Sequence, residues 1–438
     1  MQYNQFHVHF GVGKIFLGLL LESIIQSNYT LLCFQRESKD WKKLLKKKNH
    51  KVTVKVNNHS VTTLTIIHKN NYKQHITNTK THLLYIGDID DTLLCSLKYM
   101  KSFSCSLGKS IRHIIPILNN ISNKINGKTI YICENDQKEI KHIKHTLMKK
   151  QWNVVPCMID RVCTKRMIQH NYIHVLTEEW KGQIIVYPTK ENNKVPFKGN
   201  KVILTNNIHF AEFLLHKKLS LVNGLHTIIA FFTLIQELRD NNFNKNLIKL
   251  PGNYPLSQFS SLDIKDKKII LSWIILRCYI LYHQYSIKLL KSYFKTEETN
   301  RIISNLVEYA FCSIDRFENT TDTTKRVLNA GISKRFETRI KQPSMFVYAM
   351  EHFKATMFNP ISTTVCKYSK IKDLSLRKTE VCKHVNHFVK TSYEFMLEDK
   401  KRLDLKKKKK NHYRMRTNIM IIAILFILIQ IICYNYST

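Results

Sequence analysis

The first 25 residues carry the feature that most limits how this chain folds: a strand pattern, two glycines and a helical pattern in direct succession. Residues 6–10 alternate apolar and polar side chains as a strand does, and Gly11-Val12-Gly13 follows at once. A helical pattern then runs over residues 14–25. Such a unit opens dinucleotide-binding folds, because bare glycine backbone lets a pyrophosphate approach the start of the helix. The third glycine of the usual motif is Phe16 here, so this motif alone is a weak signal.

The rest of residues 1–203 alternates strand and helix patterns, which favours a mostly parallel sheet. Further strands are expected at residues 30–34, 83–86, 129–132 and 154–159, and a helix at 111–121. The pattern within residues 40–80 suits exposed strands or a hairpin. One of these strands leads into Glu134 and Asn135, and open α/β sheets bind ligands at such carboxyl ends. The sequence therefore predicts an α/β, Rossmann-type domain over residues 1–203.

Arg36 follows the second expected strand, where NAD-preferring sites usually carry an acidic residue. An arginine at this position accepts the 2′-phosphate of NADP, whereas an ordinary surface arginine has no such role. Both alternatives stay open, so the sequence predicts either NAD or NADP as the cofactor.

Residues 204–399 form a second region, in which long helical patterns dominate. Helices are expected at residues 208–217, 218–238, 268–293, 298–315 and 343–358. The 438 residues exceed what one hydrophobic core usually serves, and an apolar content of 44% is enough for two cores. We therefore expect an all-α C-terminal domain after the Rossmann-type domain.

The helical region contains Lys218, Asn223 and His226, at offsets 0, +5 and +8. On an α-helix these offsets fall near roughly 0°, 140° and 80°, so the three side chains can line one side. A lysine whose pKa is lowered by burial can take the proton of a secondary alcohol, while an amide and an imidazole donate hydrogen bonds to its oxygen. The alternative is a solvated lysine, a chance amide and a core histidine, since short helical patterns recur by chance.

The glycine turn and the Lys218 stretch belong to a series of six short motifs. The series consists of His9-Phe10-Gly11-Val12-Gly13, Ser106-Leu107-Gly108, Cys133-Glu134-Asn135, Met158-Ile159-Asp160-Arg161-Val162, the Lys218, Asn223 and His226 positions, and Arg316-Phe317-Glu318-Asn319 followed by Arg326-Val327. Together and in this order, over roughly 330 residues, they resemble the mannitol dehydrogenase family, the polyol-specific long-chain dehydrogenases.

This resemblance implies hydride transfer between NAD or NADP and a sugar alcohol, of the mannitol or mannitol-1-phosphate type, without a metal. It gives Lys218 the role of general base and has Asn223 and His226 bind the reacting oxygen. The positions that it assigns to the cofactor are Gly11, Val12, Gly13, Arg36, Ser106, Gly108, Glu134 and Asn135. The positions that it assigns to the substrate are Asp160, Arg161, Arg316, Asn319 and Lys334.

Three departures from the family pattern keep other functions open. Pro156 stands where mannitol 2-dehydrogenases carry an asparagine that polarises the oxygen, and no acidic residue stands a few positions after Trp180. Asn329 and Ser333 stand where the sugar-phosphate branch has paired arginines. One alternative is a sugar-acid reductase of the tagaturonate or fructuronate type, which residues 223–227 favour. The other is an inactive family member that acts as a membrane-tethered binding protein.

The chain is strongly basic, with 70 Lys and Arg against 32 Asp and Glu and a formal charge of +38, which is compatible with a nucleic-acid partner. The basic residues are spread along the chain without a zinc-finger, RNA-recognition or helix-turn-helix pattern, so no nucleic acid is expected. The eleven cysteines include no CxxC pair and indicate neither a disulfide framework nor a metal cluster. They favour a reducing compartment, with the body of the protein in the cytoplasm. The sequence does not give the oligomeric state, and a monomer is the default expectation.

The C-terminal end combines a basic run with an apolar segment. Residues 400–416, a basic linker, include Lys406 to Lys410, and residues 417–435 are mostly apolar. A helix over this segment spans about 27 Å, close to the roughly 30 Å hydrocarbon core of a membrane. By the positive-inside rule the basic run keeps the body on the cytoplasmic side, so we expect a transmembrane tail anchor. A buried terminal helix or a helix on the membrane surface is the alternative.

Overall fold

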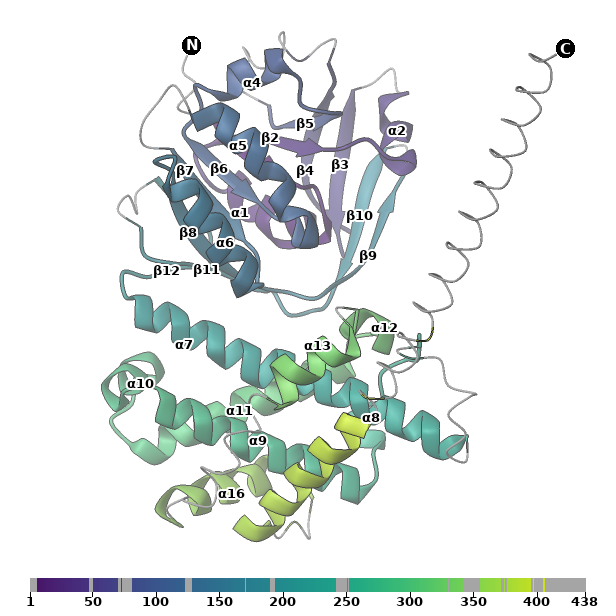
Figure 1. The fold of residues 1–438 in the computed structure, drawn as a ribbon, viewed down its shortest axis with the longest axis vertical. Coiled ribbons are helices and arrows are strands. Elements are labelled where there is room, and N and C mark those ends of the chain that lie inside the picture. The colour runs from purple at the N-terminus through teal and green to yellow at the C-terminus, as the bar shows by residue number, and fades with distance from the viewer. Residues whose placement is uncertain are drawn as a thin grey trace, which may run out of the picture. The chain divides into compact units, whose positions relative to one another are not determined.

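The computed structural model describes residues 6–46, 50–69, 72, 81–122, 128–169, 171–189, 194–241, 250, 252–329, 331–341, 355–371, 374, 376–394, 397 and 405 (Figure 1). By its internal contacts the chain divides into two units. The first consists of Met1–Lys218 and Asn319–Thr321, and the second of Leu219–Glu318 and Asp322–Thr438. The first unit is a mixed α/β structure built on one sheet, and the second is helical.

The centre of the first unit is a parallel sheet with an informative strand order. Six strands, β1 (Phe6–Phe10), β2 (Thr30–Gln35), β5 (Leu83–Ile86), β6 (Ser102–Cys105), β7 (Thr129–Cys133) and β8 (Asn153–Asp160), pair in the order β5-β2-β1-β6-β7-β8, all parallel. If these six strands are renumbered 1 to 6 along the chain, their order in the sheet is 3-2-1-4-5-6, which is the order of the Rossmann fold. Such folds bind ligands at the carboxyl ends of the strands where the order reverses, here β1 and β6. The predicted Rossmann-type domain with a mostly parallel sheet is confirmed.

Further strands among the described residues extend this sheet to twelve. They are β3 (Lys51–Val56), β4 (His59–Ile67), β9 (Cys163–Ile168), β10 (Tyr172–Thr177), β11 (Gln183–Val186) and β12 (Val202–Leu204). β3 and β4 form a hairpin, one of the two alternatives predicted within residues 40–80. Its two turn residues, Asn57 and Asn58, have φ of 47° and 70°, which suits a tight hairpin turn. β9 to β12 were not among the expected strands.

Helices cover both faces of the sheet (Figure 1). One face carries η2 (Phe16–Leu20), α1 (Leu21–Ile25) and α2 (Lys39–Leu45), and the other carries α4 (Asp91–Leu97), η3 (Gly108–Ile114), α5 (Ile115–Ser122) and α6 (Gln137–Met148). Phe16 and Trp41 are buried in the first core, and Phe6, Val8 and Phe10 of β1 are buried in the second. The helix predicted at residues 111–121 therefore begins as a 3-10 turn and continues as α5.

The second unit contains only helices among its described regular elements. They are η5 (Leu219–Gly224), α8 (Leu225–Asp240), η6 (Phe259–Ser261), α9 (Ile264–Gln284), α10 (Ile287–Phe294), α11 (Thr299–Glu318), α12 (Thr324–Val327), α13 (Ile332–Phe336), η7 (Glu337–Lys341) and α16 (Ala355–Ser369), and residues 378–394 are also helical. α8, α9 and α11 pack against one another through buried apolar side chains. η5 and η7 are π-helices. The predicted helical C-terminal region is confirmed.

One helix prediction in this unit is wrong. The pattern at residues 268–293 was expected to be a single helix, but the structure has α9 and α10 with a break at Tyr285, whose φ of −123° and ψ of 151° are extended. Ser286 begins the second helix, because its hydroxyl accepts a hydrogen bond from Leu289 N at 3.4 Å. The apolar periodicity is continuous over both helices, so the sequence pattern alone does not show that a capping serine begins a new helix here.

The division between the units falls after Lys218, later than the boundary expected after residue 203. α7 (Ile208–Lys218) belongs to the first unit, where it contacts β11. The apolar tail at residues 417–435 and most of the basic linker and of the helix predicted at 343–358 lie outside the described residues. Among the described residues, the helical stretch Ile208–Asp240 is long and apolar enough to cross a membrane. Since 78% of its most apolar window is buried inside the protein, it is weak evidence for a membrane span.

Candidate active site

Gly11 makes the turn at the carboxyl end of β1. Its φ of 100° lies in the region that favours glycine, and its N–H donates to Phe34 O at 3.0 Å. A Cβ at this position would lie 2.7 Å from Leu107 Cδ2 and 2.8 Å from Ser106 O. Gly13 is less confined, since a Cβ there would lie 3.9 Å from Ser106 O. Position 11 therefore requires glycine, and Gly13 leaves bare backbone beside the point where the strand order reverses.

Val12, between these glycines, is held through its backbone. Its side chain is buried, its N–H donates to Gln35 Oε1 at 3.2 Å, and its carbonyl accepts from Arg166 Nη1 at 2.9 Å. Both neighbours come from other strands, β2 and β9. The middle of the turn is thus fixed by long-range bonds.

Phe16 occupies the position of the third glycine of the motif, and the structure shows how the fold accommodates it. Its ring is fully buried and stacks on the His9 ring, with centroids 4.1 Å apart and planes 18° apart. The close approach between helix and sheet occurs instead at Gly18, where a Cβ would lie 2.8 Å from Cys163 Sγ and 3.0 Å from Thr177 Cγ2. Residues 16–20 are wound as a π-helix. Gly18 therefore has the packing role usually given to the third glycine.

Buried hydrogen bonds run along β1 and β6 toward the glycine turn. His7 bonds Ser102 Oγ through Nδ1 at 2.8 Å and Ser104 Oγ through Nε2 at 2.7 Å. His9 bonds Ser104 Oγ through Nδ1 at 2.6 Å and Ser106 Oγ through Nε2 at 2.9 Å. Gly11 O, at the end, lies 3.2 Å from both His9 Nε2 and Ser106 Oγ. The His-Ser ladder consists of the side chains of Ser102, His7, Ser104, His9 and Ser106.

The carbonyl at the end of the ladder fixes the direction of its protons. Burial keeps His9 neutral, and Gly11 O only accepts, so the one ring proton of His9 lies on Nε2 and His9 Nδ1 accepts. Ser104 gives its one proton to His9 Nδ1, so His7 Nε2 donates to Ser104 and His7 Nδ1 accepts from Ser102. Both imidazoles are therefore neutral Nε2–H tautomers. Burial supports this, because it lowers the pKa of His9 to about 3 and that of His7 well below its usual value.

The remaining positions assigned to the cofactor lie at the carboxyl ends of β2, β6 and β7. Arg36 is exposed directly after β2. Gly108 has a φ of 56°, and its N–H donates to Glu134 Oε1 at 2.5 Å. Burial raises the pKa of Glu134, while the hydrogen bond from Gly108 opposes the rise. The structure thus brings Gly11, Ser106, Gly108 and Glu134 to one edge of the sheet, as the motif order predicts.

Lys218 ends α7 with its side chain buried at the carboxyl end of β8. Its Nζ donates to Ile159 O and lies 3.7 Å from Asp160 Oδ1, and the Lys218 and Asp160 side chains are 5% and 4% exposed. Asn135 holds the same peptide, since its Nδ2 donates to Ile159 O at 2.9 Å and its Oδ1 accepts from Ile159 N at 3.2 Å. Asn135 therefore positions the carbonyl that binds the lysine, a contact that its motif did not reveal.

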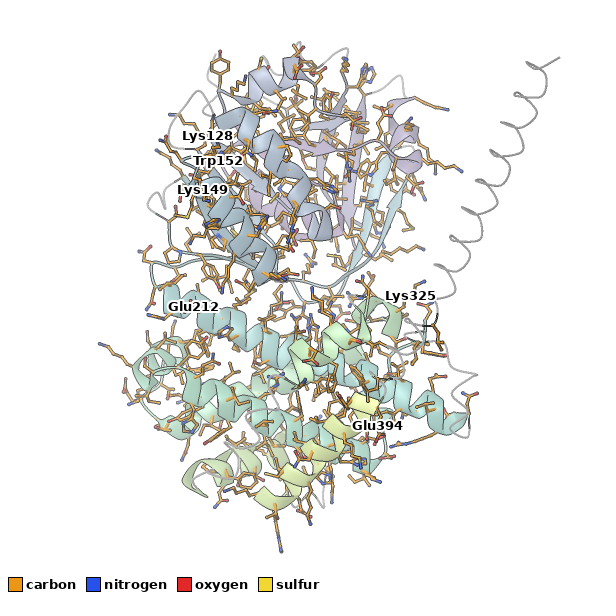
Figure 2. All side chains as sticks on the ribbon, in the orientation of Figure 1. Lys128, Lys149, Trp152, Glu212, Lys325 and Glu394 are labelled. Carbon is orange, nitrogen blue, oxygen red and sulfur yellow. The ribbon has the colours of Figure 1, made fainter. Side chains whose placement is uncertain are left out.

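Two other buried lysines were not found from the sequence. Lys217 is 5% exposed, and burial lowers its pKa to about 7 although the charge of Asp160 opposes this. Lys128 precedes β7, at the opposite edge of the sheet (Figure 2), and its Nζ donates to Ile121 O. Burial lowers the pKa of Lys128 to about 8. The only sequence signal for Lys217 is that it shares a helix end with Lys218.

In the second unit, His226 lies between a carboxylate and an aromatic ring. Its Nε2 is 2.9 Å from Asp322 Oδ2, but the two atoms lack the alignment of a hydrogen bond. Its ring stacks on Phe317, with centroids 4.0 Å apart. Burial lowers the pKa of His226 to about 4, although Asp322 opposes the change. His226 is therefore a neutral imidazole at pH 7.

Asn223 lies on η5, one turn before His226, and is partly exposed. Its backbone carbonyl accepts a hydrogen bond from Arg339 Nη1 at 3.2 Å, and the same Nη1 donates to Thr227 Oγ1 at 3.0 Å. Asp322, the neighbour of His226, is bound by Nε and Nη2 of Arg326. Neither Asp322 nor Arg339 was among the expected site residues.

The positions assigned to the substrate are spread over both units. Arg161 donates to Gly18 O at 2.6 Å and to Thr177 Oγ1 at 2.7 Å, so its guanidinium supports the helix after the glycine turn. Arg316 lies over the Phe317 ring at 5.9 Å, while Asn319 and Lys334 are exposed. The substrate roles of these four residues stay predictions. Among the described residues, no group of three or more His, Cys, Asp and Glu side chains could hold a metal ion.

No protein-family model matches the chain, and no curated protein matches it. The solved structures that are similar to it include the following three. The mannitol 2-dehydrogenase of Pseudomonas fluorescens, in a ternary complex with NAD and D-mannitol, is 12% identical, with a TM-score of 0.47 over 88% of this chain and 85% of that one. A substrate-free D-sorbitol dehydrogenase is 10% identical, with a TM-score of 0.49 over 90% and 94%. Yersinopine dehydrogenase with bound NADP+ is 10% identical, with a TM-score of 0.45 over 90% and 100%. Likeness this distant does not extend to an activity, so what this site does must come from its own residues.

Proposed function

We propose that the protein is an NAD(P)-dependent oxidoreductase that transfers a hydride between nicotinamide and the secondary alcohol of a sugar alcohol or sugar acid. The strand order supports a dinucleotide site, because the glycine turn follows β1 at the point where that order reverses. The π-wound helix after the turn directs its N-terminal end toward this point, where backbone N–H groups favour the pyrophosphate.

The observation that carries this proposal is the buried Lys218 beside Asp160 in the same unit as the glycine turn. Both lie at the carboxyl edge of one parallel sheet. β8 and β1 are three strand spacings apart, or about 14 Å, so a dinucleotide lying along this edge passes from one to the other. A buried amine at the end of that path is suited to accept a proton from a substrate hydroxyl.

The backbone between Lys218 and His226 also supports the proposal. Residues 219–224 form a π-helix, whose hydrogen bonds link residues five apart, and five is the spacing from Lys218 to Asn223. Single π turns inside helices occur frequently at functional sites.

In the proposed oxidation, the amine of Lys218 accepts the hydroxyl proton as the substrate C–H bond breaks. The hydride passes to the nicotinamide ring, and the alcohol becomes a ketone. The Asn223 amide and an N–H of the neutral His226 donate hydrogen bonds to the oxygen as it gains negative charge. Reduction of the ketone reverses each step.

A substrate panel with the full chain in detergent tests the proposal, with NAD and NADP each assayed at 340 nm by absorbance. Because positioned general bases contribute about 10²–10⁴-fold, Lys218→Met is expected to lower kcat by that factor. Lys217→Met is the matched control, since it removes the adjacent buried amine and should leave most of the activity. If no polyol, sugar acid or sugar phosphate supports turnover although a cofactor binds, the catalytic proposal fails.

An inactive binding protein is the second candidate, and Pro156 favours it. This proline lies inside β8, where it pairs with Ile132, and it has no side-chain donor for a substrate oxygen. Cofactor binding without turnover would support this candidate. Attachment to a membrane through residues 417–435 also stays a proposal, and carbonate extraction of membranes from expressing cells tests it.

A further inference from the structure

The proposed oxygen-binding residues of the second unit lie beside an arginine that sequence motifs did not assign. Arg339 is part of η7, a π-helix that contacts the π-helix η5. Its Nη1 bonds both Asn223 O and Thr227 Oγ1, on the two sides of His226 in the sequence. Arg339 is therefore fixed on the helical segment that carries Asn223 and His226.

A second arginine supports Arg339 from the interior. Arg277 of α9 is 5% exposed, and its Nη2 donates to Arg339 O at 2.7 Å. Its guanidinium lies over the Trp273 ring at 4.7 Å, and its Nε is buried without a hydrogen-bond partner among the described residues. Burial lowers the pKa of Arg277 to about 9. A buried cation with this environment is costly, and an anion nearby would offset the cost.

The charges described around Arg339 are unbalanced. Burial, followed by the charges of Arg335 and Arg326, lowers the pKa of Arg339 to about 9, and no described acid opposes this. Asp322 is the acid nearest His226, and Arg326 binds both of its oxygens. Positive charge thus exceeds negative charge beside Asn223 within the described part of this unit.

Solvent reaches this face, so a ligand can reach it too. Asn223 and Arg339 are partly exposed, and the side chain of Arg326 is 34% exposed. A guanidinium presents several N–H groups in one plane, and two of them match the two oxygens of a carboxylate or phosphate. A neutral polyol offers no charge to balance the arginines.

We infer that Arg339, held in place by Arg277 and bonded to the backbone at Asn223, binds an anionic group of the substrate, a carboxylate or a phosphate. This inference extends the proposed function and rests on it for the assignment of the reacting alcohol. The binding of an anion by Arg339 does not depend on the proposed function. It selects sugar acids or sugar phosphates over neutral polyols. Arg339 then anchors the far end of the substrate while Asn223 and His226 hold its reacting oxygen.

Two measurements on the full chain test the inference. The first is calorimetric titration with inorganic phosphate and with acetate at constant ionic strength, for the wild type and for Arg339→Gln, Arg339→Lys and Lys341→Gln. Lys341→Gln is the matched control, because it removes one positive charge from the same π-helix where Lys341 pairs with exposed Glu337. Loss of anion binding in Arg339→Gln, partial retention in Arg339→Lys and no change in the control are expected.

The second measurement compares kcat/KM for matched substrates, such as sorbitol, gluconate and sorbitol 6-phosphate. We expect Arg339→Gln to lower kcat/KM for the preferred anionic substrate by on the order of 100-fold, mainly through KM, because hydrogen bonds to charged groups are worth about 1.5–3 kcal/mol. Whether gluconate or the phosphate shows the larger loss identifies the anion. The kcat/KM for neutral sorbitol should fall less, so the preference for the anionic substrate over sorbitol should decrease.

The outcomes separate this inference from the proposed function. If anion binding depends on Arg339 but no substrate is turned over, the anion site is supported and the proposed oxidoreductase activity is contradicted. If neutral and anionic substrates are turned over with equal kcat/KM, and Arg339→Gln does not change these values, the oxidoreductase activity is supported and the anion site is contradicted. Absence of both also overturns it. Thermal unfolding of each variant shows whether a loss comes from misfolding instead.

Discussion

The glycine turn and the region around His226 satisfy their buried polar groups in opposite ways. In the first, the His-Ser ladder uses only neutral groups, and each donor meets an acceptor. In the second, the groups are charged: Arg277 is buried, Arg326 and Arg339 are partly exposed, and Arg326 binds the carboxylate of Asp322. A closed neutral network holds a backbone shape at little electrostatic cost, whereas an excess of positive charge depends on a partner. The proposed cofactor region is therefore complete by itself, and the proposed substrate region is not.

Gly11→Ala should have the largest effect, because it breaks the neutral region at its end. The new Cβ would lie within 2.8 Å of Ser106 O and Leu107 at a φ of 100°, so the turn must move. We expect a loss of about 3 kcal/mol in the free energy of unfolding and no measurable cofactor binding, by denaturant unfolding and fluorescence titration.

Gly108→Ala is the control for this variant. Gly108 also has a positive φ, of 56°, but nothing lies within 4 Å of a Cβ there. Only backbone strain of about 1 kcal/mol is expected. If both variants lost the same stability, the close contact with Ser106 would not be the reason that position 11 needs glycine.

Asp322→Asn tests the charged region and should have the next largest effect. It leaves Arg326 without its carboxylate and removes the acid nearest His226, so we expect a loss of about 2 kcal/mol at pH 7. Asp40→Asn, which breaks the exposed pair with Lys43, is the control and should change stability by less than about 0.5 kcal/mol. Chemical unfolding at several pH values measures both.

The stabilisation that Asp322 provides should depend on pH in a definite direction. Burial raises the pKa of the Asp322 carboxyl, but the hydrogen bonds from Arg326 and the closeness of His226 outweigh it, so the pKa in the folded protein is lowered from 3.8. Its stabilisation is therefore present above pH 4 and is lost as the pH falls below that value. The wild type and Asp322→Asn should approach each other in stability below pH 4. A constant difference down to pH 2 would contradict the ion pair.

The fold was predictable from local patterns, because the glycine turn, the apolar strands and the helical runs each follow from neighbouring residues. β9 was not, since it carries Lys165 and Arg166 and lacks an apolar face. The fold turns Arg166 inward, where it bonds Val12 O and lies over the Trp41 ring at 5.1 Å. A polar strand of this kind is recognisable only with its distant partners in place.

The site was predictable only where its residues share a motif. Lys218 and Asn135 came from motifs, but Arg339 is 116 residues from the Asn223 carbonyl that it binds.

β1 is another case in which a contact between distant residues limits what the sequence can predict. His7 and His9 suggested a half-polar strand, yet both faces are buried, and the matching spacing of Ser102 and Ser104 on a parallel strand explains this. Recognising it from sequence requires knowing that the two strands are neighbours.

His9→Gln and His9→Asn test the ladder and should have the smallest effect. A glutamine amide nitrogen reaches the place of Nε2 and can still donate to Gly11 O, while an asparagine amide oxygen reaches the place of Nδ1 and accepts only from Ser104. If the ladder works by holding the Gly11 carbonyl, the glutamine variant keeps cofactor affinity within about threefold and the asparagine variant loses about fivefold or more, one neutral hydrogen bond. Asparagine leaves a gap beside Phe16 that is one methylene larger, so the thermal unfolding of both variants is measured to separate this packing loss from the lost hydrogen bond. Equal cofactor affinities of the two variants would mean that the glycine turn keeps its shape without the ladder. The contrast between the neutral region and the charged region would then rest on Asp322 and Arg339 alone.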